Sequence, residues 1–265
     1  MGTNNIAFVT ITCNQDWPFL RDFAAGYEVG QRFDIVTRVF QAIRIKVLIN
    51  ITNGCYTPNN IHSDYHNDTN EWQMRKLPHT HSISHFPGRP WTTVEIDQIM
   101  FTHIPTIEEE MRLNLPGLRA LVLKFMIHHH TTACQKHGPC RWKFPQCVNA
   151  VTHCDESGTW HTWRGADDVW VVPYNPHLLW QFQGHVCLIA CAGTAAIGYL
   201  FKYPFKGDTH ARCAIRRAHT EAACVSPDNP PGRRNYCVPP KPHRKRHRSN
   251  IPHQRVSHHH SITCC

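Results

Sequence analysis

The first 49 residues constrain the fold most, because they combine a clear strand pattern with a clear helix pattern. Residues 8–13, "FVTITC", alternate bulky and polar side chains and are rich in β-branched types, which predicts a strand. Residues 34–49 carry apolar side chains at positions 35, 36, 39, 40 and 43, the spacing of one helix face. Asp34 is expected to cap this helix, since its carboxylate can accept an unpaired backbone N–H. The chain therefore contains both strands and helices.

Further elements are predicted along the rest of the chain. Residues 55–70 are polar and predict an irregular loop, whereas residues 71–81 predict a hairpin that turns near residues 76–78. Leu118 follows a Pro-Gly pair and begins a helix that we expect over residues 118–127. We also expect a short strand at 169–172 and a helix at 194–203. The stretch at 178–186 is apolar, but its pattern does not distinguish a helix from a strand.

Composition narrows the class of protein. The longest uncharged apolar run, residues 186–201, is shorter than the about 20 residues that a membrane span needs, and the start of the chain has no signal-peptide pattern. We therefore expect a soluble protein with no membrane partner and no small-molecule cofactor. The 13 cysteines then indicate reduced thiols or metal ligands rather than disulfides. The net charge of +9 favours polyanionic partners, nucleic acid first.

His79 and His81, in "LPHTH", form the first candidate site. Residues two apart on a strand point to the same face, so both imidazoles could bind one cation. If the predicted hairpin forms, Glu71 and Gln73 lie across from them, and Glu71 could add an oxygen ligand. Such a mixed nitrogen and oxygen set suits Mn²⁺ or Mg²⁺. The chain has 22 histidines, so a chance pair on a solvated strand is the alternative.

Tyr199 and Tyr203, in "YLFKYPFKG", form the second candidate site. Residues four apart lie on the same face of a helix, so the two phenols could offer two nucleophiles to one site. A phenol has a pKa of about 10, and attack at neutral pH needs a nearby cation or a metal-polarised phosphate. Lys202 and Lys206 could supply positive charge. The alternative is a pair of tyrosines packed on the buried side of the helix.

A third candidate site lies in a region where cysteines and histidines are mixed. Its members are Cys134, Cys140, Cys147, Cys154, His128, His129, His130, His137 and His153. Zinc accepts mixed Cys/His sets, and the zinc ligands we expect are His128, Cys134, His137 and Cys140. The spacings between the cysteines are wider than the C-x₂₋₄-C of common zinc motifs, so isolated buried thiols are the alternative.

Six blocks of the sequence occur in an order that resembles one known family. They are "FVTITCNQDWPFL", "FDIVTRVF", "EWQMRKLPHTH", "LPGLRALVLKFMIH", "CRWKFPQ" and "WVVPYNPHLLWQFQGHVCLIACAGTAAIGYLFKYPFKG". Together they resemble the helicase-like N-terminal (Rep) region of Helitron transposon proteins, which belongs to the HUH family of single-strand nucleases. The resemblance covers roughly residues 8–208, and "VVPYNPHLL" and "YLFKYPFKG" are its most specific parts. His129 and His130 stand where the family has its first cysteine after "MIH".

The resemblance implies an α+β fold with a mainly antiparallel central sheet that carries the histidines, flanking helices and an irregular Cys/His-rich insertion. By the family pattern, His79, His81 and Glu71 would bind a divalent ion. Tyr199 and Tyr203 would be the nucleophiles, with Lys202 near the scissile phosphate. The implied function is nicking and strand transfer on single-stranded DNA. No helicase motor is expected, because the chain has no G-x-x-x-x-G-K-[ST] phosphate loop.

The same resemblance divides the chain into a Rep-like domain, residues 1–208, and a basic tail, residues 209–265, that we expect to be disordered. The run "KPHRKRHR" at 241–248 is typical of a nuclear signal or a phosphate-binding segment, so a nuclear protein is expected. Two other functions stay open. One is an inactive nucleic-acid-binding fragment of a transposon protein, and the other is a zinc-binding interaction module built on residues 128–154.

Overall fold

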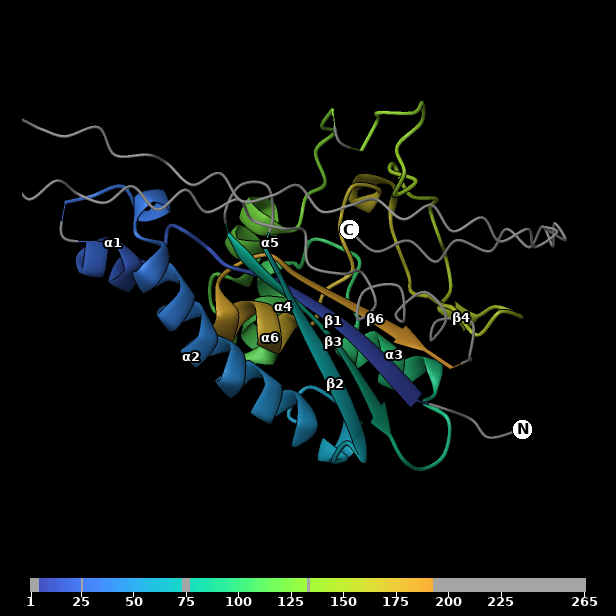
Figure 1. Cartoon of the computed structure of the whole chain (residues 1–265). Helices are drawn as coiled ribbons and strands as arrows, with labels where there is room; N and C mark the ends of the chain where they lie inside the picture. Colours follow the sequence, from blue (N-terminus) through green and yellow to red (C-terminus); the bar gives the residue numbers. More distant parts are fainter. Residues whose placement is uncertain (1–4, 25, 73–76, 133, 193–265) are drawn as a thin grey trace, which may run out of the picture. The chain divides into compact units, whose positions relative to one another are not determined.

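The computed structural model describes residues 5–24, 26–72, 77–132 and 134–192. The described part of the chain contains both helices and strands, which confirms the predicted α+β class (Figure 1). The strands are β1 (Asn5–Thr12), β2 (Tyr65–Trp72), β3 (Pro78–Phe86), β4 (His153–Cys154), β5 (Trp160–His161) and β6 (Val186–Cys191). The α-helices are α1 (Pro18–Ala24), α2 (Phe33–Thr52), α3 (Thr93–Ile99), α4 (Ile107–Leu113), α5 (Leu118–Phe125) and α6 (Pro176–Phe182). None of these described helices is both long and apolar enough to cross a bilayer.

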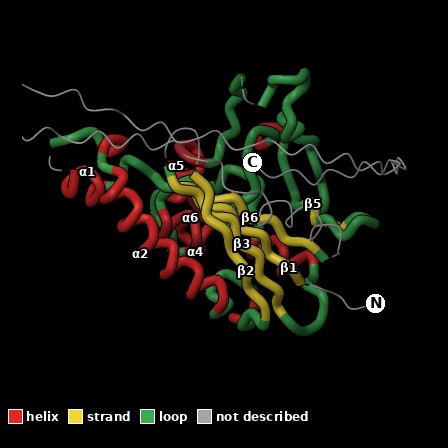
Figure 2. The backbone as a smooth tube through the Cα atoms, viewed as in Figure 1, coloured by secondary structure: helices red, strands yellow, loops and turns green. Residues whose placement is uncertain are grey.

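A four-stranded sheet in the order β2-β3-β1-β6 forms the centre of the fold, and every neighbouring pair in it is antiparallel (Figures 1 and 2). This confirms the expected antiparallel sheet. β1 and β6 are buried along almost their whole length, as their apolar sequences require. β2 lies at the edge of the sheet and alternates between exposed and half-buried residues. β4 and β5 form a separate two-stranded sheet.

Helix α2 packs against β3, and α6 packs against both α2 and β6. The ion pair between Arg44 of α2 and Asp68 of β2 fixes which face α2 covers. Asp68 lies opposite Ser82 in the register, and Ser82 points away from the face of His81 because side chains alternate along a strand. Helix α2 therefore covers the sheet face opposite to the two histidines. Leu20, Ile96, Leu118, Leu178 and Leu179 are fully buried in the core between helices and sheet.

Several predicted elements are confirmed. The strand expected at residues 8–13 is β1, the helix expected at 34–49 is α2, and the helix expected at 118–127 is α5. The hairpin expected at 71–81 is the antiparallel pair of β2 and β3, in which Glu71 lies opposite His79. The apolar stretch at 178–186, whose secondary structure was left undecided, contains most of α6, a short connection and the first residue of β6.

Three expectations are wrong, each for a local physical reason. Residues 55–70 were expected to be a loop, but β2 begins at Tyr65; an edge strand needs no apolar alternation on its exposed side, so its polar sequence hid it. Asp34 lies inside the first turn of α2, where it pairs with Arg32, the N-cap residue. Residues 169–172 form no strand; Val171 makes one isolated bridge, to Ile127.

Three further expectations fall outside the described residues. These are the helix at 194–203, the domain boundary at 208 and the basic tail at 209–265.

Candidate functional site

His79 and His81, the histidine pair, lie on β3 next to the central strand β1. The register places Thr12 directly opposite His79 and Thr10 directly opposite His81. The Oγ1 of Thr12 is 2.7 Å from Nδ1 of His79, and the Oγ1 of Thr10 is 3.0 Å from Nδ1 of His81. An imidazole whose Nδ1–H donates to a hydroxyl oxygen presents Nε2 as its metal-binding nitrogen. In both rings Nδ1 therefore faces a threonine hydroxyl, and Nε2 lies on the other side of the ring.

The histidine pair is compact and buried. The ring centroids are 4.4 Å apart with an interplanar angle of 82°, and the two residues are 6% and 7% exposed. Phe8 stacks on His81 with a centroid distance of 5.7 Å. Packing and hydrogen bonds together hold the rings in place.

Glu71 extends this arrangement from the neighbouring strand β2. Its Oε2 is 3.8 Å from Nε2 of His81, on the side of the ring away from Thr10. Two imidazoles and one carboxylate are therefore neighbours, and they are the mixed nitrogen and oxygen side chains that the sequence predicted here. Gln73 was expected to lie across from the histidines together with Glu71, but the residue opposite His81 is Thr69. Gln73 itself lies outside the described residues, as do Tyr199, Lys202 and Tyr203.

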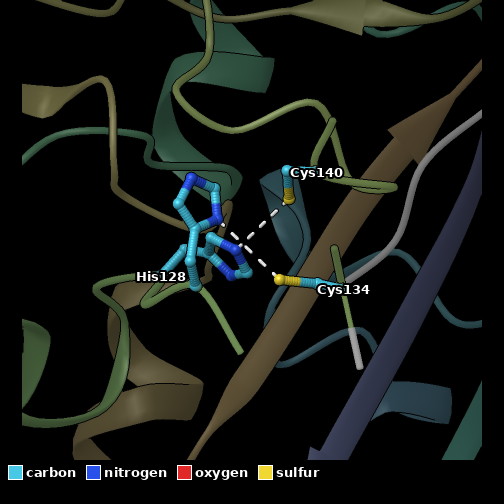
Figure 3. Close-up of side chains that lie close together, drawn as sticks. His128, Cys134 and Cys140 are labelled. Atoms are coloured by element: carbon cyan, nitrogen blue, oxygen red, sulfur yellow. Dashed lines mark hydrogen bonds between the residues drawn. The ribbon is translucent and has the colours of Figure 1, made fainter. Parts of the chain in front are cut away.

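A second set of metal-binding side chains converges between α5 and β4. Its four ligand atoms all lie within 4.8 Å of one another, so the set could hold a metal ion. Figure 3 shows the side chains of His128, Cys134 and Cys140 pointing toward a common point. We call the following four residues the Cys/His cluster: His128, His130, Cys134 and Cys140.

The distances within the Cys/His cluster are short. Nε2 of His128 is 3.4 Å from Sγ of Cys140, and Nδ1 of His130 is 3.8 Å from Sγ of Cys134. The two cysteines are 2% and 7% exposed, whereas His128 is half-buried and His130 is exposed. The thiols thus face the interior and the imidazoles close the cluster from outside.

The sequence predicted His137 as the fourth ligand, and the structure places His130 there instead. His137 lies in an exposed turn between Cys134 and Cys140. His128 and His130 are two residues apart in a segment that is neither helix nor strand, and the ligand atoms of both lie near the two cysteines. The sequence did contain a signal for this choice, because His129 and His130 stand where the resembling family has a cysteine.

The electrostatics of the Cys/His cluster favour the protonation states that bind metals. Burial acts to raise the pKa of the Cys134 thiol, but hydrogen bonds from Thr131 and His130 outweigh it and lower the pKa to about 7. The Thr131 N–H donates to the Cys134 sulfur over 3.1 Å. Burial lowers the pKa of His128, and the neighbouring His130 and His129 lower it further. Thiolate and neutral imidazole are the forms that coordinate metal ions.

Aromatic side chains surround His128. Its ring stacks on Phe144 with a centroid distance of 4.3 Å and lies edge-on to Trp142. Its backbone N–H donates to the Trp170 carbonyl over 2.8 Å. This packing holds the ring of His128 in place.

The other members of the Cys/His-rich region stay apart from the Cys/His cluster. Cys147 and Cys154 are exposed, and His153 stacks on His161 in the β4–β5 sheet. None of the eight described cysteines is in a disulfide.

Comparison of the chain with models of protein families and with curated proteins gives no match. The interpretation of both sites therefore depends on their own chemistry and on the sequence motifs.

Proposed function

We propose that this chain nicks single-stranded DNA and transfers the cut strand, as an HUH-type endonuclease with tyrosine nucleophiles and a divalent cation. One observation carries the proposal: two histidines side by side on β3, each held at Nδ1 by a threonine of β1, with Glu71 beside them on β2. The conformation of such a site is set before substrate binds, which is what metal-assisted catalysis requires.

His79, His81 and Glu71 would hold the cation, for which the donor set fits Mn²⁺ or Mg²⁺. When bound, a divalent cation polarises a phosphate oxygen and so makes the phosphorus easier to attack. The threonine hydroxyls hold the Nδ1 side of each ring, so that Nε2 lies on the side of the ring away from β1. Helix α2 closes the opposite face of the sheet, so DNA would approach from the histidine face.

Tyr199 and Tyr203 are the proposed nucleophiles. A phenol oxygen attacks phosphorus, and the bond from phosphorus to the 3′ oxygen breaks. The phenol loses one proton, and the leaving 3′ oxygen gains one. The products are a 5′-phosphotyrosine and a free 3′-OH. The second tyrosine permits a second transfer, and Lys202 supplies positive charge near the phosphate.

The proposal is tested with a labelled single-stranded oligonucleotide, Mn²⁺ and a gel assay for covalent adducts. His79→Ala and His81→Ala should each abolish the adduct, whereas His85→Ala should not. His85 is a matched control because it lies on the same strand and face, about 13 Å beyond His81 at about 3.3 Å per residue. Adducts that survive Tyr199→Phe combined with Tyr203→Phe would exclude these tyrosines as nucleophiles. Strand binding without metal-dependent cleavage would identify the alternative, an inactive nucleic-acid-binding fragment.

For the Cys/His cluster we propose zinc. Bonds of about 2.3 Å to sulfur and about 2.0 Å to nitrogen, in a tetrahedron, separate the ligand atoms by about 3.3–3.8 Å. The two shorter separations in the cluster, 3.4 and 3.8 Å, lie in this range. The longest separations, up to 4.8 Å, require the ligands to close by about 1 Å. Two thiolates with two imidazoles are a set that zinc prefers over magnesium or manganese.

The basic run at residues 241–248 supports a nuclear location for the protein.

A further inference from the structure

The positive charge of the chain is unevenly distributed around the Cys/His cluster. Residues 1–208 contain 17 Lys and Arg and 17 Asp and Glu, so this part of the chain is neutral as a whole. Residues 111–154 nevertheless contain no Asp or Glu. They contain six basic residues, Arg112, Arg119, Lys124, Lys136, Arg141 and Lys143. The region of the cluster is thus a local concentration of positive charge within a neutral domain.

Three of these cations lie on one short segment, residues 134–144, which we call the basic loop. Lys136, Arg141 and Lys143 are all exposed, and among the described residues none of the three is in an ion pair. By contrast, Lys124 lies 3.6 Å from Asp16 and Arg112 lies 3.8 Å from Glu109. The basic loop therefore presents charges that its own fold does not neutralise.

An aromatic ring accompanies these charges. The Arg141 guanidinium lies 4.3 Å from the centroid of the half-buried Trp142 ring. A guanidinium over an indole ring can still donate its N–H groups to a phosphate, and both groups have planar faces on which an unstacked base can stack. Paired cations and aromatic rings of this kind are typical of surfaces that bind single-stranded nucleic acid.

The basic loop is tied to the Cys/His cluster through its backbone, and the buried Phe144 anchors its far end. Between α5 and β4, the described residues form no helix and no strand. Among the backbone hydrogen bonds of the loop, the Arg141 N–H donates to the Cys134 carbonyl over 2.9 Å and the Lys143 N–H donates to the Cys140 carbonyl over 2.8 Å. Both therefore join a cation of the loop to a cysteine of the cluster. A metal bound to the cysteines would fix the backbone of these two cations.

We propose that the metal at the Cys/His cluster holds the basic loop in one conformation, and that the basic loop binds the phosphate backbone of single-stranded DNA. The proposal rests on the zinc site proposed above and extends the proposed action on single strands by naming a second DNA-binding surface. Lys136, Arg141 and Lys143 contact phosphates, and the stacked Arg141 and Trp142 contact a base.

The metal is tested first, without DNA. The purified full-length chain is titrated with Co²⁺, whose thiolate charge-transfer absorption reports sulfur ligands, and its zinc content is measured. Cys140→Ser and His130→Ala should lose the cobalt absorption and the bound zinc. His137→Ala should keep both, and it is the matched control because His137 lies between the two cysteines in sequence but outside the cluster. If all three variants bind the same amount of zinc, the proposed zinc site at the Cys/His cluster is wrong.

DNA binding is tested next, in the absence of Mn²⁺ and Mg²⁺ so that cleavage plays no part. Combined replacement of Lys136, Arg141 and Lys143 by Ala should reduce the slope of log affinity against log salt by about 2, at about 0.7 per phosphate contact on single strands. At 0.1 M salt this corresponds to a loss of affinity on the order of 100-fold. The control removes three exposed cations elsewhere, Arg21, Arg38 and Lys46, and should change the slope much less.

The remaining outcomes decide each part separately. Zinc binding with an unchanged salt slope in the loop variant would overturn the DNA-binding role and leave the zinc site intact. Equal affinity for a duplex of the same length would overturn the preference for single strands. DNA affinity that is unchanged after the zinc is removed by a chelator would overturn the role of the metal in ordering the loop. Because none of these measurements needs strand cleavage, their failure is distinct from failure of the proposed nicking.

Discussion

At the scale of single residues, the chemistry of both sites depends on neighbours that bind no metal themselves. Thr10 and Thr12 set the nitrogen that each histidine presents, and Thr131 stabilises the Cys134 thiolate. Such supporting contacts typically change metal affinity or activity by about 10–100-fold when they are removed. They also offer tests that leave the ligands themselves in place.

Thr12→Val should reduce metal-dependent nicking by about 10–100-fold, because valine keeps the shape of the side chain but removes the hydroxyl that orients His79. Nicking rate is measured as a function of Mn²⁺ concentration, and the loss should appear as a higher metal requirement. Thr12→Ser restores the hydroxyl and should recover most of the rate. A valine variant as active as the parent would show that the hydrogen bond does not position the ring.

At the scale of elements, the ends of helices show why certain polar residues are buried. Asn175 precedes α6, and its Oδ1 accepts from the Leu178 N–H over 2.9 Å. Its Nδ2 donates to the Ile99 carbonyl over 2.9 Å, which ties α6 to the end of α3. The "YNP" of the sequence therefore encodes a helix cap and a contact between two helices.

Asn175→Ala should lower the free energy of unfolding by about 2–4 kcal/mol, because it removes the cap and leaves the buried Ile99 carbonyl without its donor. The free energy is measured by urea denaturation. Asn175→Ser keeps a neutral oxygen that can cap the helix and loses the amide donor, so it should lie between the parent and the alanine variant. A serine variant as unstable as alanine would assign the whole effect to the lost amide donor.

Glu95, in the first turn of α3, gives a pH-dependent prediction. Hydrogen bonds from Arg89, and then from the Thr92 backbone, lower its pKa from 4.5 to about 2. Because the folded-state pKa is depressed, the stabilisation by its charge is fully present above pH 4.5 and is lost as the pH falls toward 2. Glu95→Gln can still cap the helix, so it should cost about 1 kcal/mol at pH 7 and progressively less between pH 4.5 and 2. The free energy of unfolding of both proteins is measured by urea denaturation across this pH range. A difference between the two free energies that does not change with pH would contradict the prediction.

At the scale of the whole molecule, the net charge belongs to the tail. Residues 209–265 contain 11 Lys and Arg and two Asp and Glu, a difference equal to the +9 of the whole chain. The basic character that indicated a nucleic-acid partner therefore says little about the sheet that carries the histidine pair. The tail and the basic loop are the proposed sources of affinity for DNA, and the histidine pair is the proposed site of chemistry on it.

Removal of residues 209–265 should weaken binding to single-stranded DNA by at least about 10-fold at 0.1 M salt, since many of the phosphate contacts would be lost. Nicking at saturating oligonucleotide should change little, because the proposed catalytic residues all precede residue 208. Fluorescence anisotropy across a salt series measures the first effect and the adduct assay the second. Unchanged affinity would assign the dominant electrostatic contact to the basic loop instead.

The elements with strong apolar periodicity, and the types of residue in both sites, could be predicted from the amino-acid sequence alone. Helices α2 and α5 and strand β1 follow from apolar spacing, because burial of one face or both faces leaves a regular pattern. The pairing of Glu71 with His79 followed from the hairpin, a local contact. Strand β2 was missed because an edge strand needs no such pattern, and its place follows only from pairing with β3.

Contacts between side chains that are far apart in the sequence could be found only from the folded structure. The threonines of β1 reach the histidine pair because β1 and β3 are paired, about 70 residues apart in the chain. His130, rather than His137, joins Cys134 and Cys140, and His137 lies in the exposed turn between the two cysteines. Spacing along an irregular segment does not fix where its side chains point, since no repeating backbone geometry relates one residue to the next. The sequence therefore predicted which types of residue bind the metal, and the fold decided which four of these residues come together.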